Sequence, residues 1–276
     1  MSDYSWAIPV MRAGYAGRGL TYVAIAGLSL WAILRGGQAQ GTTSAMETLS
    51  TSVWGIAILW LIAVGLLAYA VWRCIAAAAD LEDHGTDAKA AIARLGMAVT
   101  GLIHGALGLV AIVTALGLTG GGGGIPGAVG WVLGLPGGRW IVGLAAIGTL
   151  GAGAYYLKKA WTADHRNNLK ANHFTLNWDW ALRAGVVAQG IIVLLIGGFL
   201  GAATINGNPN EAGGLAKVFD WLATRPFGNT LVIALCLGLL GFAFFCFVNA
   251  AYRIVAKASD DTLASLADRV QAELSR

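Results

Sequence analysis

Long apolar runs alternate with short polar segments along the chain. Six of these runs are rich in Leu, Ala, Ile and Gly and approach or exceed the roughly 20 residues that a helix needs to cross a bilayer core of about 30 Å. The predicted spans are residues 15–34, 53–72, 95–118, 139–157, 184–204 and 230–249. The runs are continuous, whereas the strands of a membrane barrel alternate apolar with polar residues. The pattern therefore predicts an all-α polytopic membrane protein with six transmembrane helices.

The odd-numbered spans share one motif. The pattern Arg-x-Gly-x-x-x-x-Gly occurs three times, as RAGYAGRGLTY (12–22), RLGMAVTGLIH (94–104) and RAGVVAQGIIV (183–193). The even-numbered spans share a weaker pattern, in which a glycine is followed by an aromatic residue four positions later and by a polar residue eight positions later. Its three copies are Gly65, Tyr69 and Arg73, then Gly151, Tyr155 and Lys159, then Gly241, Phe245 and Asn249. The repeating unit is therefore a helical hairpin that is used three times.

These motifs resemble an uncharacterised bacterial integral membrane family, domain of unknown function 1206, over about residues 12–255. Its members look like three tandem two-helix repeats, each opening with an Arg-x-Gly-Tyr-type motif followed by Arg-Gly. The first copy here keeps the whole motif, and the other two lose the second arginine. The resemblance implies a fold and no activity. We predict a single membrane domain (1–276) of three parallel hairpins, 12–80, 94–165 and 183–255, around a pseudo-threefold axis.

Composition and charge agree with the membrane class. The chain is 57% hydrophobic and 12% charged, with a mean hydropathy of +0.67, whereas soluble domains carry about 25% charged residues. Fourteen Lys and Arg residues gather on one side of the predicted spans and four on the other. By the positive-inside rule, this bias predicts a bacterial inner-membrane protein with both termini in the cytoplasm. The net charge of +4 then suits anionic phospholipid headgroups at the cytoplasmic face, and no segment resembles a nucleic-acid-binding surface.

The second arginine of the first motif is the main candidate for chemistry. Residues four apart share a helix face, so Gly14, Arg18 and Tyr22 form one stripe. Across the repeats, this stripe defines two layers of equivalent residues: Arg18, Thr100 and Gln189, then Tyr22, His104 and Val193. Polar groups at this depth usually face the bundle interior. We expect Thr100 and Gln189 to accept hydrogen bonds from Arg18 and Tyr22 to cap it; the alternative is a buried cluster that only locks the repeats together.

The first arginine of each motif, Arg12, Arg94 and Arg183, is expected at the level of the cytoplasmic headgroups. There each can extend its guanidinium to the interface and satisfy the positive-inside rule, or the three can form a ring for anions. The shared glycines are expected to let helix backbones approach closely.

Other motifs carry little chemistry. His84 lies among acidic residues without a second histidine or a cysteine at ligand spacing, so no metal site is predicted. The glycine-rich run 119–127 lacks the ending of a phosphate loop, and the outer loops are expected to be plain turns. Residues 259–276 are predicted to form an amphipathic cytoplasmic helix. No nucleophile–base pair or haem-ligand pair is present, so we expect neither an enzyme nor a cofactor.

Two functions remain open. All 14 acidic residues lie outside the predicted spans, which favours anions or neutral solutes over cations. The first hypothesis is a protein that binds or permeates a small anionic or neutral solute or a lipid headgroup. Its predicted ligand-binding residues are Arg18, Tyr22, Thr100, His104, Gln189, Arg12, Arg94 and Arg183. The alternative is a structural or accessory subunit that meets a membrane-protein partner or another copy of itself.

Overall fold

The computed structural model describes residues 4–118, 123–170, 173–255 and 265. Six helices in this part of the chain are long and apolar enough to cross a membrane. They are α1 (Ala7–Leu34), α3 (Val53–Ala79), α4 (Ala88–Ala115), α6 (Gly138–Trp161), α8 (Asp179–Asn206) and α10 (Gly228–Tyr252). Each extends beyond its apolar run at the end predicted to face the cytoplasm, because a helix can continue into polar residues outside the lipid. The predicted all-α, six-helix membrane fold is confirmed.

Polar residues set the bend between α3 and α4. Asp80 ends α3 in the left-handed conformation, with φ at 49°, and its carboxylate accepts hydrogen bonds from the backbone nitrogens of His84 (2.9 Å) and Gly85 (3.1 Å). Asp87 then caps the first turn of α4 by accepting from Ala90 N at 2.8 Å. Such caps satisfy helix-end groups that would otherwise lack partners. The loop 80–87 therefore holds its shape through its own backbone contacts.

The outer loops are not the plain turns that we expected. Each hairpin carries a short helix between its two spans: α2 (Thr42–Ser50), α5 (Gly124–Leu133) and α9 (Leu215–Ala223). In α9, Leu215, Val218 and Phe219 share one buried face, as an amphipathic helix requires. Of the glycine-rich run, residues 119–122 lie outside the described part, and α5 begins at its second half. Three further short elements are η1 (Asp164–Asn168), α7 (His173–Asn177) and η2 (Pro209–Glu211).

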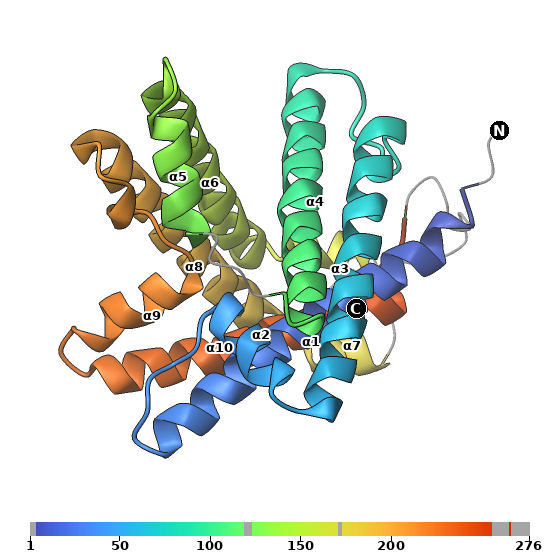
Figure 1. Ribbon diagram of the computed structural model, residues 1–276. Coiled ribbons are helices and arrows are strands. Elements are labelled where there is room, and N and C mark those ends of the chain that lie inside the picture. Colours follow the sequence, from blue (N-terminus) through green and yellow to red (C-terminus); the bar gives the residue numbers. More distant parts are fainter. Residues whose placement is uncertain (1–3, 119–122, 171–172, 256–264, 266–276) are drawn as a thin grey trace.

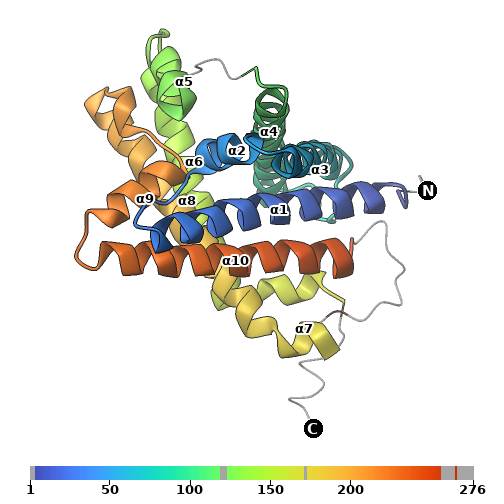
Figure 2. The ribbon, with the colours of Figure 1, turned by 60° about the horizontal axis from the view of Figure 1, so that its bottom comes forward.

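The closest helix pairs join one repeat to the next. They are α3 with α4, α6 with α8, and α1 with α10, so the second helix of each repeat packs on the first helix of the following repeat in cyclic order. Figure 1 shows these pairs splayed, and in Figure 2 α1 and α10 lie side by side across the view while α3 and α4 are seen almost end-on. The cyclic order agrees with three equivalent repeats, whereas the threefold axis itself stays a prediction.

Packing within the repeats is unequal. The two spans of repeat one (α1, α3) and of repeat three (α8, α10) pack on each other, but α4 and α6 of repeat two are not among the helix pairs that pack in the described chain. The shared glycines record this difference. A Cβ on Gly185 would lie 2.3 Å from the backbone of Gly241, whereas one on the equivalent Gly96 would meet nothing within 4 Å. We call the unpaired faces of α4 and α6 the open seam.

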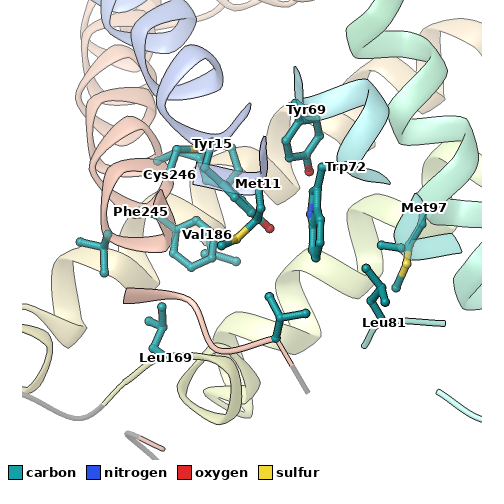
Figure 3. Close-up of a cluster of buried hydrophobic side chains, with 14 of the residues drawn as sticks. Met11, Tyr15, Tyr69, Trp72, Leu81, Met97, Leu169, Val186, Phe245 and Cys246 are labelled. Carbon is teal, nitrogen blue, oxygen red and sulfur yellow. The ribbon is translucent and has the colours of Figure 1, made fainter. Parts of the chain in front are cut away.

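The largest buried cluster lies where α1, α3 and α10 meet. In Figure 3 the side chain of Met11 lies between that of Trp72 and that of Phe245. Tyr15 and Tyr69 belong to the same cluster, and their rings meet edge to face with centroids 5.3 Å apart. Burial of such aromatic groups is a major source of stability. The cluster therefore fixes α1 against its neighbours and sets the position of Arg18.

The chain after α10 returns to the linker between α6 and α8. Lys170 N donates to Tyr252 O at 2.9 Å, and Ile254 N donates to Asn168 O at 2.9 Å. These bonds tie repeat two to repeat three. They lie at the end of the bundle that holds the α3–α4 loop and the α6–α8 linker, which we call the linker end. The predicted helix 259–276 lies outside the described residues apart from Ser265. The cytoplasmic orientation of this end stays a prediction.

Candidate functional site

The backbone of α1 allows α3 to approach the residues around Arg18. A Cβ on Gly17 would lie 2.4 Å from the Cα of Gly65, and one on Gly14 would lie 2.6 Å from the Cα of Tyr69. Only residues without a side chain permit such contact. The glycines of the first motif therefore bring the phenol of Tyr69 into reach of the arginine one turn further along α1. Their predicted packing role is seen here.

Arg18 is enclosed by aromatic side chains and only 4% exposed. Its Nη1 donates to the hydroxyl of Tyr69 at 3.0 Å, and its Nη2 donates a longer bond to the hydroxyl of Tyr156 at 3.4 Å. Its Cζ lies 5.0 Å from the ring centroid of Tyr69, 5.1 Å from that of Phe242 and 5.8 Å from that of Tyr22. Arginine over aromatic faces gains about 0.5–2 kcal/mol per contact, with the larger values in desolvated sites.

No carboxylate in the described part of the chain neutralises Arg18. Among the described residues, it takes part in no ion pair, and its Nε is buried without a hydrogen-bond partner. Neutral phenols and rings compensate only part of the cost of burying a cation, which is several kcal/mol. The interior of the bundle therefore holds an uncompensated positive charge with a free donor.

Tyr69 links this arginine to His104. The two rings are tilted with centroids 4.8 Å apart, and Nδ1 of His104 lies 2.8 Å from the carbonyl oxygen of Thr100. A carbonyl oxygen only accepts, so Nδ1 carries the hydrogen and the neutral ring presents Nε2 as an acceptor. His104 therefore packs on the same phenol ring whose hydroxyl accepts a hydrogen bond from Arg18.

A second polar contact joins α8 to α1. Gln189 is buried, and its Nε2 donates to the hydroxyl of Tyr22 at 3.2 Å, while its Oε1 has no partner in the described chain. Tyr22 also lies beside Arg18, so the two predicted layers meet at this residue. Val193, the third member of the outer layer, is only partly buried.

The predicted partners of Arg18 differ from those observed. Thr100 bonds to the carbonyl of Gly96 on its own helix at 2.7 Å, because a short hydroxyl side chain readily reaches the residue four before it. Gln189 donates to Tyr22 and makes no bond to the guanidinium. The expectation that Thr100 and Gln189 accept from Arg18 is therefore wrong, while Tyr22 does lie beside it.

Three residues that surround Arg18 were missed, namely Tyr69, Tyr156 and Phe242. The repeat pattern contained a signal for the first, because Tyr69 stands at the aromatic position of the even-numbered spans. It pointed to Tyr155 in repeat two, but that side chain is 57% exposed and its neighbour Tyr156 reaches the arginine instead. Neighbouring residues on a helix point about 100° apart, so Tyr155 and Tyr156 face different sides of α6. Because α6 packs on α8 and not on α4, the side that faces Arg18 cannot be read from the alignment of the repeats.

Two of the three motif arginines have a structural task. Arg94 donates from Nε to Ala77 O at 2.5 Å, and Arg183 donates from Nε to Ala160 O at 3.0 Å. Each thus caps the last carbonyls of the preceding repeat, where a cation also suits the helix dipole. Arg12 is exposed and makes no equivalent contact among the described residues. The three motif arginines are therefore not equivalent in their contacts, and the ring for anions stays a prediction.

A second charged cluster lies at the end where the linkers meet. One oxygen of Glu82, Oε1, lies 2.6 Å from Nη2 of Arg253 and 3.5 Å from Nη1 of Arg73. Nη1 of Arg253 donates to Asn249 Oδ1 at 3.0 Å. Lys159 adds a weaker attraction for the carboxylate. We call Arg73, Lys159, Arg253 and Glu82 the linker cluster.

Electrostatics keep Glu82 ionised in this cluster. Burial raises the pKa of a carboxyl group, but Arg253 and Arg73 outweigh that effect and lower the pKa of Glu82 from 4.5 to about 2. His84 Nε2 lies 3.8 Å from the other oxygen. No three His, Cys, Asp or Glu side chains in the described chain are placed to hold a metal ion.

The fold and the buried arginine define a class: helical multi-pass membrane proteins of three tandem repeats with a polar layer inside. The family model described as Domain of Unknown Function (DUF1206) matches residues 13–80, 95–163 and 184–253, and the chain belongs to this family. It is also similar to the Uncharacterized protein YxxB of Bacillus subtilis (strain 168), with 26% identity over 257 residues, 90% of this chain and 92% of that protein. No solved structure matches it.

Proposed function

We propose that this protein binds a small anion, or the anionic headgroup of a lipid, at Arg18 and allows the anion to cross the membrane there. The observation that carries this proposal is the buried guanidinium of Arg18, which pairs with no carboxylate of the described residues and keeps a free Nε. An uncompensated charge of this kind is costly and is retained in membrane proteins mainly at ligand and ion pathways.

The groups around Arg18 suit an anion. A phenol that accepts a hydrogen bond from arginine still has its own hydrogen to donate, and Tyr69, Tyr156 and Tyr22 surround the guanidinium. The contact to Tyr156 is the longest of the hydrogen bonds, at 3.4 Å, and an anion would replace it most easily. Nε2 of His104 supplies a nearby acceptor, which would suit an oxyanion that carries a proton or a neutral solute that donates a hydrogen bond.

The charge distribution supports selection against cations. Within the six long helices, the only acidic residue is Asp179, at the first position of α8, and Arg166 binds it at 3.1 Å and 2.5 Å. A positive centre in a medium of low dielectric attracts anions and repels cations. The excess of Lys and Arg at the linker end supports a bacterial inner-membrane protein that turns this face and both termini toward the cytoplasm.

A structural or accessory role is the second candidate, and the open seam favours it. Gly96, Gly148 and Gly151 face no neighbour within 4 Å, although equivalent glycines mediate close packing elsewhere in the chain. A helix of a partner protein or of a second copy would find small residues there, which suit close helix contact.

The test uses the full chain in nanodiscs of neutral lipid. Chloride, nitrate, phosphate and phosphatidic acid are added in turn, and binding is measured by thermal shift, since a ligand at 100 times its Kd stabilises by about 2.7 kcal/mol. We expect one class of anion to bind wild type with a Kd at least tenfold lower than its Kd for Arg18→Gln. Arg225→Gln is the matched control, because Arg225 is exposed in the loop between α9 and α10, where it lies over the ring of Trp221.

Flux measurements separate binding from permeation. Proteoliposomes loaded with the stabilising anion should release it faster than liposomes that hold Arg18→Gln, at equal protein content. If folded Arg18→Gln binds and releases every anion like wild type, the anion proposal is wrong and the accessory role takes its place.

A further inference from the structure

Two members of the linker cluster, Arg73 and Lys159, and the Arg253 partner Asn249 stand at equivalent positions of the three repeats. Arg73, Lys159 and Asn249 stand eight residues after the corresponding glycines of α3, α6 and α10. In the structure, Arg73 contacts Glu82, Asn249 holds Arg253 against the same carboxylate, and Lys159 attracts it from α6. Arg73 of repeat one and Arg253 of repeat three therefore converge on one carboxylate, with the charge of Lys159 of repeat two acting on it as well.

The charges and donors of this cluster are not balanced. Among the described residues, Arg73 and Arg253 share the single carboxylate of Glu82, and the Nε atoms of both arginines are buried without a hydrogen-bond partner. The side chain of Arg253 is only 5% exposed. Buried arginine nitrogens are normally paired, so two unpaired donors on arginines that share one carboxylate indicate a site that can accept more oxygen atoms than Glu82 supplies.

We propose that the linker cluster is a binding site for a phosphate-type oxyanion, in which Glu82 is a tethered carboxylate that occupies the site when the oxyanion is absent. The present geometry shows how such a group would be held. One oxygen of Glu82 bridges Arg253 and Arg73, as arginine pairs commonly hold a phosphate oxygen. The further oxygens of a dianionic phosphate would take up the free Nε donors and the charge of Lys159.

Glu82 is able to leave because its loop does not depend on its side chain. Asp80 holds the turn through the backbone of His84 and Gly85, and Asp87 starts α4. The loop can therefore stay folded while the Glu82 side chain rotates outward. No bond is made or broken in this exchange, in which one anion replaces another.

This site is separate from the one proposed at Arg18. Its four side chains do not touch the Arg18 guanidinium, although the two sites are connected through Tyr15, whose ring lies 5.5 Å from Cζ of Arg253 and 5.3 Å from the Tyr69 ring. A column of aromatic and basic groups thus leads from the linker end to the interior. Each site can be tested without the other.

Calorimetry on the full chain in nanodiscs tests the exchange. The probes are inorganic phosphate in neutral nanodiscs, and nanodiscs with a tenth of their lipid as phosphatidic acid, so that free phosphate and a headgroup are distinguished. We expect Glu82→Gln to bind at least one of the probes ten times or more tightly than wild type, because the competing carboxylate is gone. Glu47→Gln, which removes an exposed carboxylate from α2, should bind like wild type.

A double variant decides which cations hold the probe. Adding Arg73→Gln to Glu82→Gln should abolish the gain, whereas adding Arg18→Gln should leave it. If the gain follows Arg18 and not Arg73, the linker site is wrong while the Arg18 proposal stands. If Glu82→Gln folds poorly, phosphate should restore its melting temperature; unchanged or weaker binding by a folded Glu82→Gln, or no restoration, overturns the inference.

Discussion

The guanidinium of Arg18 on α1 donates to the hydroxyl of Tyr69 on α3 at 3.0 Å, and this is the shortest polar contact of the buried arginine. Tyr69 in turn lies against His104 of the next repeat and Tyr15 of its own. Tyr69 of α3 thus connects Arg18 and Tyr15 of α1 to His104 of α4. The position of Arg18 depends on Tyr69 more than on any residue of its own layer.

Removal of that hydroxyl should therefore destabilise the protein. Tyr69→Phe keeps the ring but leaves a buried charged donor unsatisfied, which costs about 1–3 kcal/mol. The melting temperature in detergent measures the effect. Tyr155→Phe is the matched control, because its side chain is 57% exposed and it should melt like wild type. Equal melting of both variants would show that Arg18 does not depend on the phenol.

The open seam predicts opposite results for equivalent glycines. Gly185→Ala would place a Cβ 2.3 Å from the backbone of α10, whereas Gly96→Ala would place it in open space. The first should cost about 1–3 kcal/mol through overpacking, and the second should be neutral or gain up to about 1 kcal/mol in helix propensity. Thermal melts of the two variants decide it. A marked loss in Gly96→Ala would reveal a neighbour on the seam, either α6 itself or a partner.

The motif arginines give a third comparison. Arg94→Ala removes the cap from the end of α3 and should cost about 1 kcal/mol, while Arg12→Ala removes an exposed side chain with no such contact and should cost nothing measurable. Hydrogen exchange of residues 74–79 reports the fraying of α3 directly. Faster exchange only in Arg94→Ala is expected; the same exchange in both variants would contradict the capping role.

The fold was largely predictable because long apolar runs and a recurring motif extend over most of the sequence. Six apolar runs fixed the number of helices, and the recurring Arg-x-Gly motif fixed the order of the repeats. The short helix α5 was not predictable, because it is formed by a glycine-rich stretch that local propensity disfavours. Such segments become helical through packing against the long helices.

The buried layer was predictable in part. A period of four placed Arg18 and Tyr22 on one face, and equivalence placed Gln189 in the layer of Arg18 and His104 in the layer of Tyr22; all four are buried or partly buried. Their hydrogen bonds were not predictable, because these depend on the rotation of each helix about its axis. A turn of one residue brings Tyr156 to Arg18 in place of Tyr155, and repeats contain no information on such rotations.

The linker cluster carries a prediction for pH. Glu82 faces Arg253, Arg73, Lys159 and His84, and the pKa of its carboxyl group is lowered from 4.5 to about 2 in the folded protein. Since the folded protein holds this proton less tightly than the unfolded chain, the contribution of Glu82 to stability is complete above pH 4.5 and is lost as the pH falls towards 2. The contribution at neutral pH is on the order of 3 kcal/mol.

The comparison of wild type with Glu82→Gln isolates this group from the other carboxylates. We expect the wild type to melt higher than the variant in phosphate-free buffer at pH 7, and the difference to shrink steadily below pH 4.5, because the protonated carboxyl and the amide then both lack a charge. Melting curves between pH 7 and pH 3 measure it. A constant difference across this range would mean that Glu82 stabilises the fold through its shape and not through its charge, and the cations around it would then need another anion.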